Sequence, residues 1–189
     1  MKEIQEFQGE RLTPLSEYYE NSIEGPQRVD IGTFRFKATG LVKNALLLTY
    51  DEVISKYPAV QKVVRLDCVE GWSVTILWEG ILLKDLLQEA AVKPQAQTVI
   101  IHCADGYTTS LPLEYVMNNP VLLAHKMNGL TIPPERGFPF HLVAVGKWGY
   151  KWARWVTGIE LSGDTHYKGY WEQRGYAVNG DLDKEFFEL

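Results

Sequence analysis

Two strand-like runs meet at Arg65-Leu66-Asp67-Cys68-Val69-Glu70-Gly71-Trp72-Ser73. The residue pattern predicts one strand over residues 61–67 and a second over residues 73–78, joined by a short turn that begins at Cys68. A thiol in such a turn can serve as a soft, anionic metal ligand or as a nucleophile. Free cysteine is also among the most buried residue types, so core packing is the alternative interpretation of Cys68.

The other predicted elements do not alternate in the strand–helix–strand rhythm of a parallel sheet. A capping-box pair at Thr49 and Glu52 predicts the start of one helix, and apolar spacing predicts two more over residues 82–90 and 113–118. Further strands are predicted over residues 33–38, 98–103, 107–111, 121–127, 141–145 and 155–161. Because the strands cluster, we expect an α+β domain with a mixed β-sheet and short helices.

Turn signals divide the rest of the chain. Residues 1–30 are polar and interrupted by prolines and glycine, so we expect an N-terminal arm that packs on one domain formed by residues 31–189. Asn128-Gly129 predicts a hairpin turn because both residues tolerate positive φ. The proline-rich residues 133–139 predict a surface loop, and residues 163–189 predict an irregular, aromatic-rich tail.

Composition limits the classes of function. The 189 residues are 46% hydrophobic and 23% charged, which is typical of a soluble globular domain. The net charge of -5 argues against a nucleic-acid partner, and no segment approaches the roughly 20 apolar residues of a membrane span. The polar start lacks a signal-peptide core, so a cytoplasmic location is expected for the chain as written, unless an export signal was removed.

One segment reverses the overall charge. Residues 146–154 carry Lys147, Lys151 and Arg154, together with two glycines that allow the backbone to approach a ligand closely. This combination suits a phosphate or another anion, although no standard nucleotide-loop pattern is present. A solvated basic edge strand is the alternative interpretation.

Two other roles for the cysteines are structural zinc binding and hydrolysis, and the positions of the cysteines and histidines in the sequence bear on both. Structural zinc needs three or four ligands, usually in tight pairs, and the four histidines and two cysteines show no such pairing. A cysteine-dependent hydrolase would need a histidine beside Cys68, and the sequence alone leaves that open. Two cysteines also allow at most one disulfide in a chain long enough to bury an ordinary core.

Several short motifs carry a family resemblance when they are taken together. They are Cys68-Val69-Glu70-Gly71-Trp72-Ser73, Trp78-Glu79-Gly80, Ala104-Asp105-Gly106-Tyr107, Asn128-Gly129 with Pro133-Pro134, and Gly146-Lys147-Trp148-Gly149-Tyr150-Lys151. In this order, from about Asn21 to Leu161, the chain resembles the molybdopterin-binding domain of the sulfite oxidase family. The resemblance is greatest to small prokaryotic members near the methionine-sulfoxide reductase catalytic subunit.

The resemblance implies a sulfite-oxidase-type fold that binds molybdenum and molybdopterin, with Cys68 as the catalytic residue that supplies a thiolate to the metal. It also implies cofactor contacts from Asn21, Cys103, Arg136, His141, Lys147, Lys151, Trp152, Ala153 and Arg154. The implied activity is two-electron oxygen-atom transfer on a small molecule of the sulfite or sulfoxide class, with electrons exchanged with a separate redox protein. His141 and Cys103 depart from the arginine and threonine of relatives, which leaves a non-catalytic pterin- or anion-binding module as the alternative.

Overall fold

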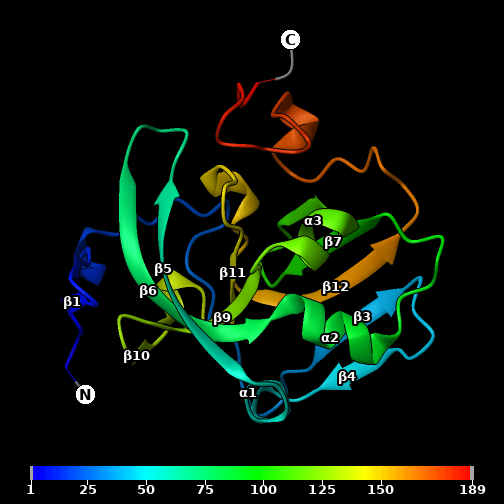
Figure 1. Ribbon diagram of the computed structural model, residues 1–189, viewed down its shortest axis with the longest axis horizontal. Helices are drawn as coiled ribbons and strands as arrows, with labels where there is room; N and C mark the ends of the chain where they lie inside the picture. The colour runs from blue at the N-terminus through cyan, green and yellow to red at the C-terminus, as the bar shows by residue number, and fades with distance from the viewer. Residues whose placement is uncertain (1, 188–189) are drawn as a thin grey trace.

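Two β-sheets form the body of the protein, whose structure is a computed structural model that describes residues 2–187 (Figure 1). The first sheet has the order β10-β9-β6-β5, with β11 also paired to β9, and the second has the order β4-β3-β12-β7-β8. The first comprises β5 (Ala59–Asp67), β6 (Ser73–Leu82), β9 (Leu122–Met127), β10 (Leu130–Thr131) and β11 (His141–Val143). The second comprises β3 (Phe36–Gly40), β4 (Leu46–Leu48), β7 (Thr98–Cys103), β8 (Thr108–Pro112) and β12 (Val156–Ser162).

The hairpin that carries Cys68 forms as the sequence predicts. Strands β5 and β6 pair in antiparallel register, with Asp67 opposite Ser73, so residues 68–72 make the turn. The Cys68 amide donates to the carbonyl of Trp72 at 2.9 Å, and the Gly71 amide donates back to the Cys68 carbonyl at 3.0 Å. Gly71 has a φ of +88°, a left-handed conformation that favours glycine. The turn therefore has one defined shape, and it holds the thiol at the end of the sheet.

The second sheet is mixed, because β12 runs parallel to β3 and antiparallel to β7. The predicted helices are present as α1 (Tyr50–Lys56), α2 (Leu83–Ala90) and α3 (Leu113–Asn118). Thr49 and Glu52 form the predicted capping box at the start of α1. Leu83, Leu86 and Leu87 of α2 are buried on one face, as the apolar spacing indicates. None of the helices among residues 2–187 is long and apolar enough to cross a membrane.

The N-terminal segment lies on the first sheet. It contains a short hairpin of β1 (Glu6–Phe7) and β2 (Glu10–Arg11). Asn128, at the predicted hairpin turn, is fully buried with a φ of +46°. Its amide nitrogen donates to the Thr13 carbonyl at 2.9 Å and to Glu3 at 3.0 Å, while its oxygen accepts from the Leu77 amide. Further along the arm, Tyr18 packs against Trp72 and Asn21 bonds to Glu70, so the arm also reaches the Cys68 turn. The division of the chain at residue 30 stays a prediction.

Two segments differ from the sequence-based expectation. Residues 146–154 form no edge strand: they contain a 3₁₀ turn over Gly149–Lys151, and both lysines are buried. The proline-rich loop contains a 3₁₀ turn over Pro134–Arg136 and then turns inward, so that Phe140 is fully buried. Local patterns of charge and proline do not report this burial, because it depends on segments distant in sequence. The tail has one further 3₁₀ turn over Glu172–Arg174 and lies beside residues 146–151 (Figure 1).

Candidate functional site: a cleft at the Cys68 turn

Five segments from distant parts of the sequence enclose one cleft. The arm contributes residues around Asn21, the β5–β6 hairpin contributes the Cys68 turn, the segment 149–155 forms a third wall, and the tail supplies Trp171 and Tyr176. Asp105 and Tyr107, after β7, complete the lining. The cavity volume is about 130 Å³. The cleft is therefore built by tertiary packing rather than by any single element.

Cys68 lies at the floor of this cleft and is 7% exposed. Its Sγ accepts from Nδ2 of Asn21 at 3.7 Å and donates to Oε2 of Glu70 at 3.6 Å. Burial raises the pKa of the Cys68 thiol to about 11, and the neighbouring Glu70 carboxylate also raises it. The free thiol is thus protonated at neutral pH, whereas coordination to a metal ion would keep it deprotonated. Among the described residues no histidine lines the cleft, so the hydrolase alternative lacks its base.

Asn21 and Arg154 are 133 residues apart in sequence but are bonded to each other beside the thiol. The Asn21 Oδ1 accepts from Nη2 of Arg154 at 2.6 Å, and its Nδ2 donates to Glu70 at 3.2 Å. The Nη1 atom of Arg154 is buried and has no hydrogen-bond partner within the described part of the chain. A buried, unpaired guanidinium nitrogen in a cleft fits an anionic ligand group such as a phosphate.

The residues present fit a molybdenum–pterin group. Among residues 2–187, no cluster of three or more His, Cys, Asp or Glu side chains could hold a metal ion by itself. Cys68 would therefore be the protein's donor, and the other ligands would come with the cofactor. Gly149 lets the third wall approach closely, because a Cβ there would lie 3.2 Å from the Asp67 carbonyl oxygen and 3.4 Å from Cα of Cys68. Trp152, Ala153 and Arg154 line the cleft, and their contacts with the cofactor stay predictions.

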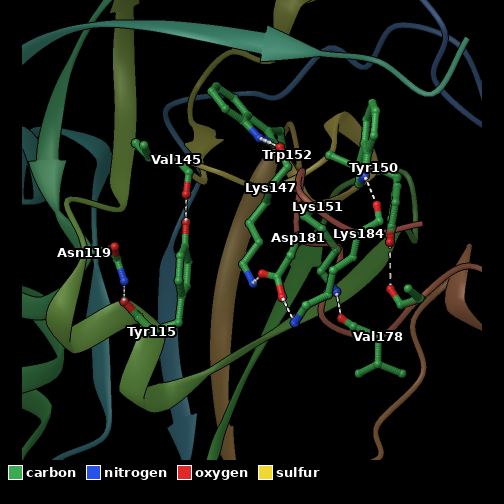
Figure 2. Close-up of polar contacts among 12 residues, drawn as sticks. Tyr115, Asn119, Val145, Lys147, Tyr150, Lys151, Trp152, Val178, Asp181 and Lys184 are labelled. Atoms are coloured by element: carbon green, nitrogen blue, oxygen red, sulfur yellow. Dashed lines mark hydrogen bonds and ion pairs between the residues drawn. The ribbon is translucent and has the colours of Figure 1, made fainter. Parts of the chain in front are cut away.

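The two lysines of the basic loop, which we define as residues 146–154, do not line the cleft. Lys147 forms an ion pair with Asp181, and Lys151 forms one with Glu172, in which both side chains are fully buried. Figure 2 shows Asp181 between Lys147 and Lys184. Carboxylates of the tail thus pair with both ammonium groups, and the predicted cofactor contacts of the two lysines stay predictions. No local pattern links partners this far apart in sequence.

Three other predicted residues stand behind the cleft instead of lining it. His141 is fully buried, and its Nε2 accepts from the Tyr18 hydroxyl at 2.9 Å. Arg136 lies 5.6 Å from the Tyr18 ring centroid, so both residues support a side chain that does line the cleft. Cys103 is buried at the end of β7. Asp105 and Tyr107, which follow it, form the wall, and the predicted cofactor contact of Cys103 stays a prediction.

Sequence reasoning predicted Trp152 but missed the other aromatic side chains that line the cleft: Tyr18, Trp72, Tyr107, Tyr150, Trp155, Trp171 and Tyr176. Burial raises the pKa of Tyr176, and the Glu70 carboxylate also raises it. Tyr176 and Cys68 line the same cleft. The available signal was only the aromatic richness of the tail, and that richness does not identify which ring reaches the cleft.

The buried imidazole of His141 predicts a pH-dependent stability. Its Nδ1 donates to the Leu142 carbonyl, and burial, with help from Arg154, lowers its pKa from 6.5 to about 3. The unfolded chain therefore binds a proton below pH 6.5 that the folded protein does not bind. The neutral imidazole therefore makes its full contribution to the free energy of unfolding above pH 6.5. That contribution is lost as the pH falls, at about 1.4 kcal/mol per pH unit.

Between pH 6.5 and 4.5, we expect the free energy of unfolding to fall by about 2–3 kcal/mol more in wild-type protein than in His141→Gln. Urea unfolding at several pH values measures both curves, and the carboxylates shared by the two proteins cancel in the difference. Parallel curves would contradict a buried neutral imidazole.

Comparison with known proteins gives one matching family and several similar chains. The family model described as "Oxidoreductase molybdopterin binding domain" matches residues 23–171. The chain is 34% identical over 157 residues to the uncharacterized oxidoreductase YuiH of Bacillus subtilis, covering 82% of this chain and 78% of that protein. It is 32% identical over 166 residues to the putative protein-methionine-sulfoxide reductase subunit YedZ1 of Azospira oryzae, covering 88% of this chain and 62% of the relative.

A solved structure has the same fold. The sulfane dehydrogenase SoxCD of Paracoccus pantotrophus matches with a TM-score of 0.72 and 24% identity, over 82% of this chain and 43% of the other. The predicted mixed-sheet, sulfite-oxidase-type fold is thereby confirmed. This chain spans less than two thirds of the length of the Azospira and Paracoccus chains.

Proposed function

The chain belongs to the oxidoreductase molybdopterin-binding domain family, and from this premise we propose that it reduces a neutral, sulfoxide-class substrate with electrons from a separate redox protein. It is a molybdopterin-binding oxidoreductase of the sulfite oxidase type. The net reaction is balanced when the sulfoxide accepts two electrons and two protons, its sulfur–oxygen bond breaks, and the oxygen leaves as water. The proposal therefore requires an external two-electron supply.

The chain's own residues would bind and orient the reacting groups. Cys68 is the thiolate donor, and Arg154, with its unpaired buried nitrogen, binds the anionic part of the cofactor. Asn21 bridges the two, since it bonds to Arg154 and lies against the Cys68 sulfur. When bound, the cofactor supplies two-electron redox chemistry and a metal position that accepts an oxygen atom. The aromatic lining excludes water from the side of the cleft next to the thiol.

The charge of the cleft is the observation that carries the choice of substrate. Among residues 2–187, its charged lining side chains are Glu70, Asp105 and Arg154, and the positive charge of the arginine is assigned to the anionic part of the cofactor. The indole of Trp72 donates to Glu70 at 2.9 Å and lowers the pKa of that carboxyl, which keeps it ionised. An incoming oxyanion such as sulfite or nitrate would meet this negative charge. A neutral sulfoxide carries no such penalty.

Two further observations support the proposal. The Azospira relative is named as a putative protein-methionine-sulfoxide reductase, which agrees with a sulfoxide substrate. It is also named as a subunit, which agrees with electrons arriving from another polypeptide. The aromatic side chains around Cys68 suit the apolar substituents of a sulfoxide.

The test compares substrates of different charge in molybdenum-loaded protein. We measure kcat/KM for an aryl methyl sulfoxide and for nitrate with a reduced dye, and for sulfite with an oxidising dye. Wild-type protein should favour the sulfoxide. In Glu70→Gln, the ratio of oxyanion to sulfoxide kcat/KM should rise about fivefold, because about 1 kcal/mol of repulsion between unit charges is removed. Glu10→Gln makes the same charge change outside the cleft and should leave the ratio unchanged. Preferential turnover of sulfite or nitrate by wild-type protein would overturn the proposal.

A further inference from the structure

Part of the tail is fastened along the basic loop, and we call residues 171–182 the strap. The Trp148 amide donates to the Gly180 carbonyl at 2.8 Å, and the Leu182 amide donates to the Gly146 carbonyl at 3.0 Å. The basic loop forms one wall of the cleft, while the strap contributes Trp171 and Tyr176 to another. The position of these two rings therefore depends on how the strap is held.

A buried ion pair links the strap to the loop. Nζ of Lys151 lies 2.6 Å from Oε1 of Glu172, and both side chains are fully buried. The same glutamate oxygen accepts from the Thr109 hydroxyl at 2.6 Å. The Lys151 ammonium also donates to the Val178 carbonyl at 2.7 Å, as Figure 2 shows. One lysine thus holds the strap at two points, Glu172 and Val178, which lie on either side of Tyr176 in the sequence.

Close packing leaves this arrangement little freedom. A Cβ at Gly180 would lie 2.6 Å from Cγ of Lys151 and 2.9 Å from the Tyr150 hydroxyl oxygen. The Tyr150 hydroxyl donates to the Ala177 carbonyl at 2.7 Å, next to Tyr176. The Tyr176 ring packs against Tyr150 and Trp171, with centroids 5.0 Å and 5.2 Å away. The contacts on both sides of Tyr176 therefore fix its backbone and its ring together.

The energetics favour a positional role for the pair over a purely stabilising one. Burying two charges costs desolvation energy that their attraction only offsets, and well-packed apolar residues often serve stability equally well. In some proteins, buried ionic or polar groups specify one arrangement of their partners, which an apolar contact does not do. Here that geometry is transmitted to a ring in the cleft.

We propose that the buried Lys151–Glu172 pair is a positioning device that holds the strap on the basic loop and thereby places the Tyr176 phenol opposite Cys68. Lys151 and Glu172 act through Tyr176 and do not line the cleft. The inference rests on the cleft of the proposed function, but its first test needs neither cofactor nor turnover.

The first test uses the full chain without cofactor and follows alkylation of each cysteine by iodoacetamide with site-resolved mass spectrometry. If the strap loosens, Cys68 becomes accessible, whereas Cys103 stays buried in the second sheet. In Glu172→Gln and Lys151→Met, we expect Cys68 to react about tenfold faster or more, with the Cys103 rate unchanged, as local opening requires. Lys184→Met, which removes the exposed cation of the neighbouring cluster, should change neither rate.

Two results would overturn the inference. Unchanged Cys68 reactivity in both variants would show that the pair does not hold the strap. Faster reaction of both cysteines in Glu172→Gln would show that the pair maintains the whole fold. Lys151→Met leaves a buried carboxylate without its partner, so if that variant alone unfolds, the milder Glu172→Gln decides the question.

A second test uses the loaded enzyme and a double-mutant cycle. Glu172→Gln and Tyr176→Phe should each lower kcat by about tenfold or more, as loss of a positioned proton-bearing group does. The double variant should be no slower than Tyr176→Phe, because the pair acts through that phenol. If the two losses in kcat multiply in the double variant, the positioning role is overturned. If the loaded protein does not reduce sulfoxides at all, the proposed function fails, while the alkylation result still tests the inference.

Discussion

Cys68→Ser should lose at least about a hundredfold in turnover and should lose the visible absorption of the oxidised site. In other metal sites, removing a group that only orients a ligand lowers metal affinity or activity by about 10–100-fold. Removing the ligand itself should therefore cost more. A serine hydroxyl is a hard donor that stays protonated, whereas a thiolate is soft and contributes sulfur-to-metal charge transfer. Steady-state kinetics and an absorption spectrum of metal-loaded protein measure both effects.

The matched control for this substitution is Cys103→Ser. Both cysteines are buried, but Cys68 lines the cleft and Cys103 does not. The same change of sulfur to oxygen should therefore leave the absorption band intact at position 103. Equal turnover and equal spectra in the two variants would contradict the assignment of Cys68 as the metal ligand, because only an effect shared by both sites would remain.

Phe140→Ala should destabilise the protein by about 3–5 kcal/mol, through loss of buried apolar surface and the cavity left behind. Phe140 is fully buried, and its ring packs against Phe34, Phe36 and Tyr50, with centroids 5.9, 6.0 and 5.3 Å away. It directly precedes β11 of the first sheet, while Phe36 belongs to β3 of the second. One ring thus joins the two sheets.

Urea unfolding at pH 7 measures this loss. Phe140→Leu is the matched control, since it keeps much of the apolar volume and should cost about 1–2 kcal/mol. A loss below about 1.5 kcal/mol for the alanine variant would contradict the role of this ring as the contact between the sheets.

The local elements could be predicted from sequence because each depends on neighbouring residues. The capping box at Thr49, the hairpin at Asn128-Gly129 and the apolar face of α2 all involve residues within a few positions of one another. Sheet order could not be predicted in this way. The parallel pairing of β12 with β3 joins residues about 120 positions apart, and periodicity carries no information about such a partner.

The site was predictable only in part for the same reason. Cys68 stands out locally as a thiol in a turn, and the family resemblance added Asn21 and Arg154, which the structure brings together. Lys147 and Lys151 show the limit of reading charge from sequence. Their partners Asp181 and Glu172 lie 34 and 21 residues downstream in an irregular segment, so the lysines resembled an anion site when they were viewed alone.

The walls of the cleft come from segments that are far apart in the sequence, and this limits when the cleft can form during synthesis. The Cys68 turn leaves the ribosome well before Tyr176, which lies far downstream in the sequence. Until that residue is free, the growing polypeptide has the Cys68 hairpin without its final wall, because domains complete their tertiary contacts only when the contributing segments are present. The binding site is therefore completed only after Tyr176 has emerged, and cofactor that arrives earlier meets an open surface.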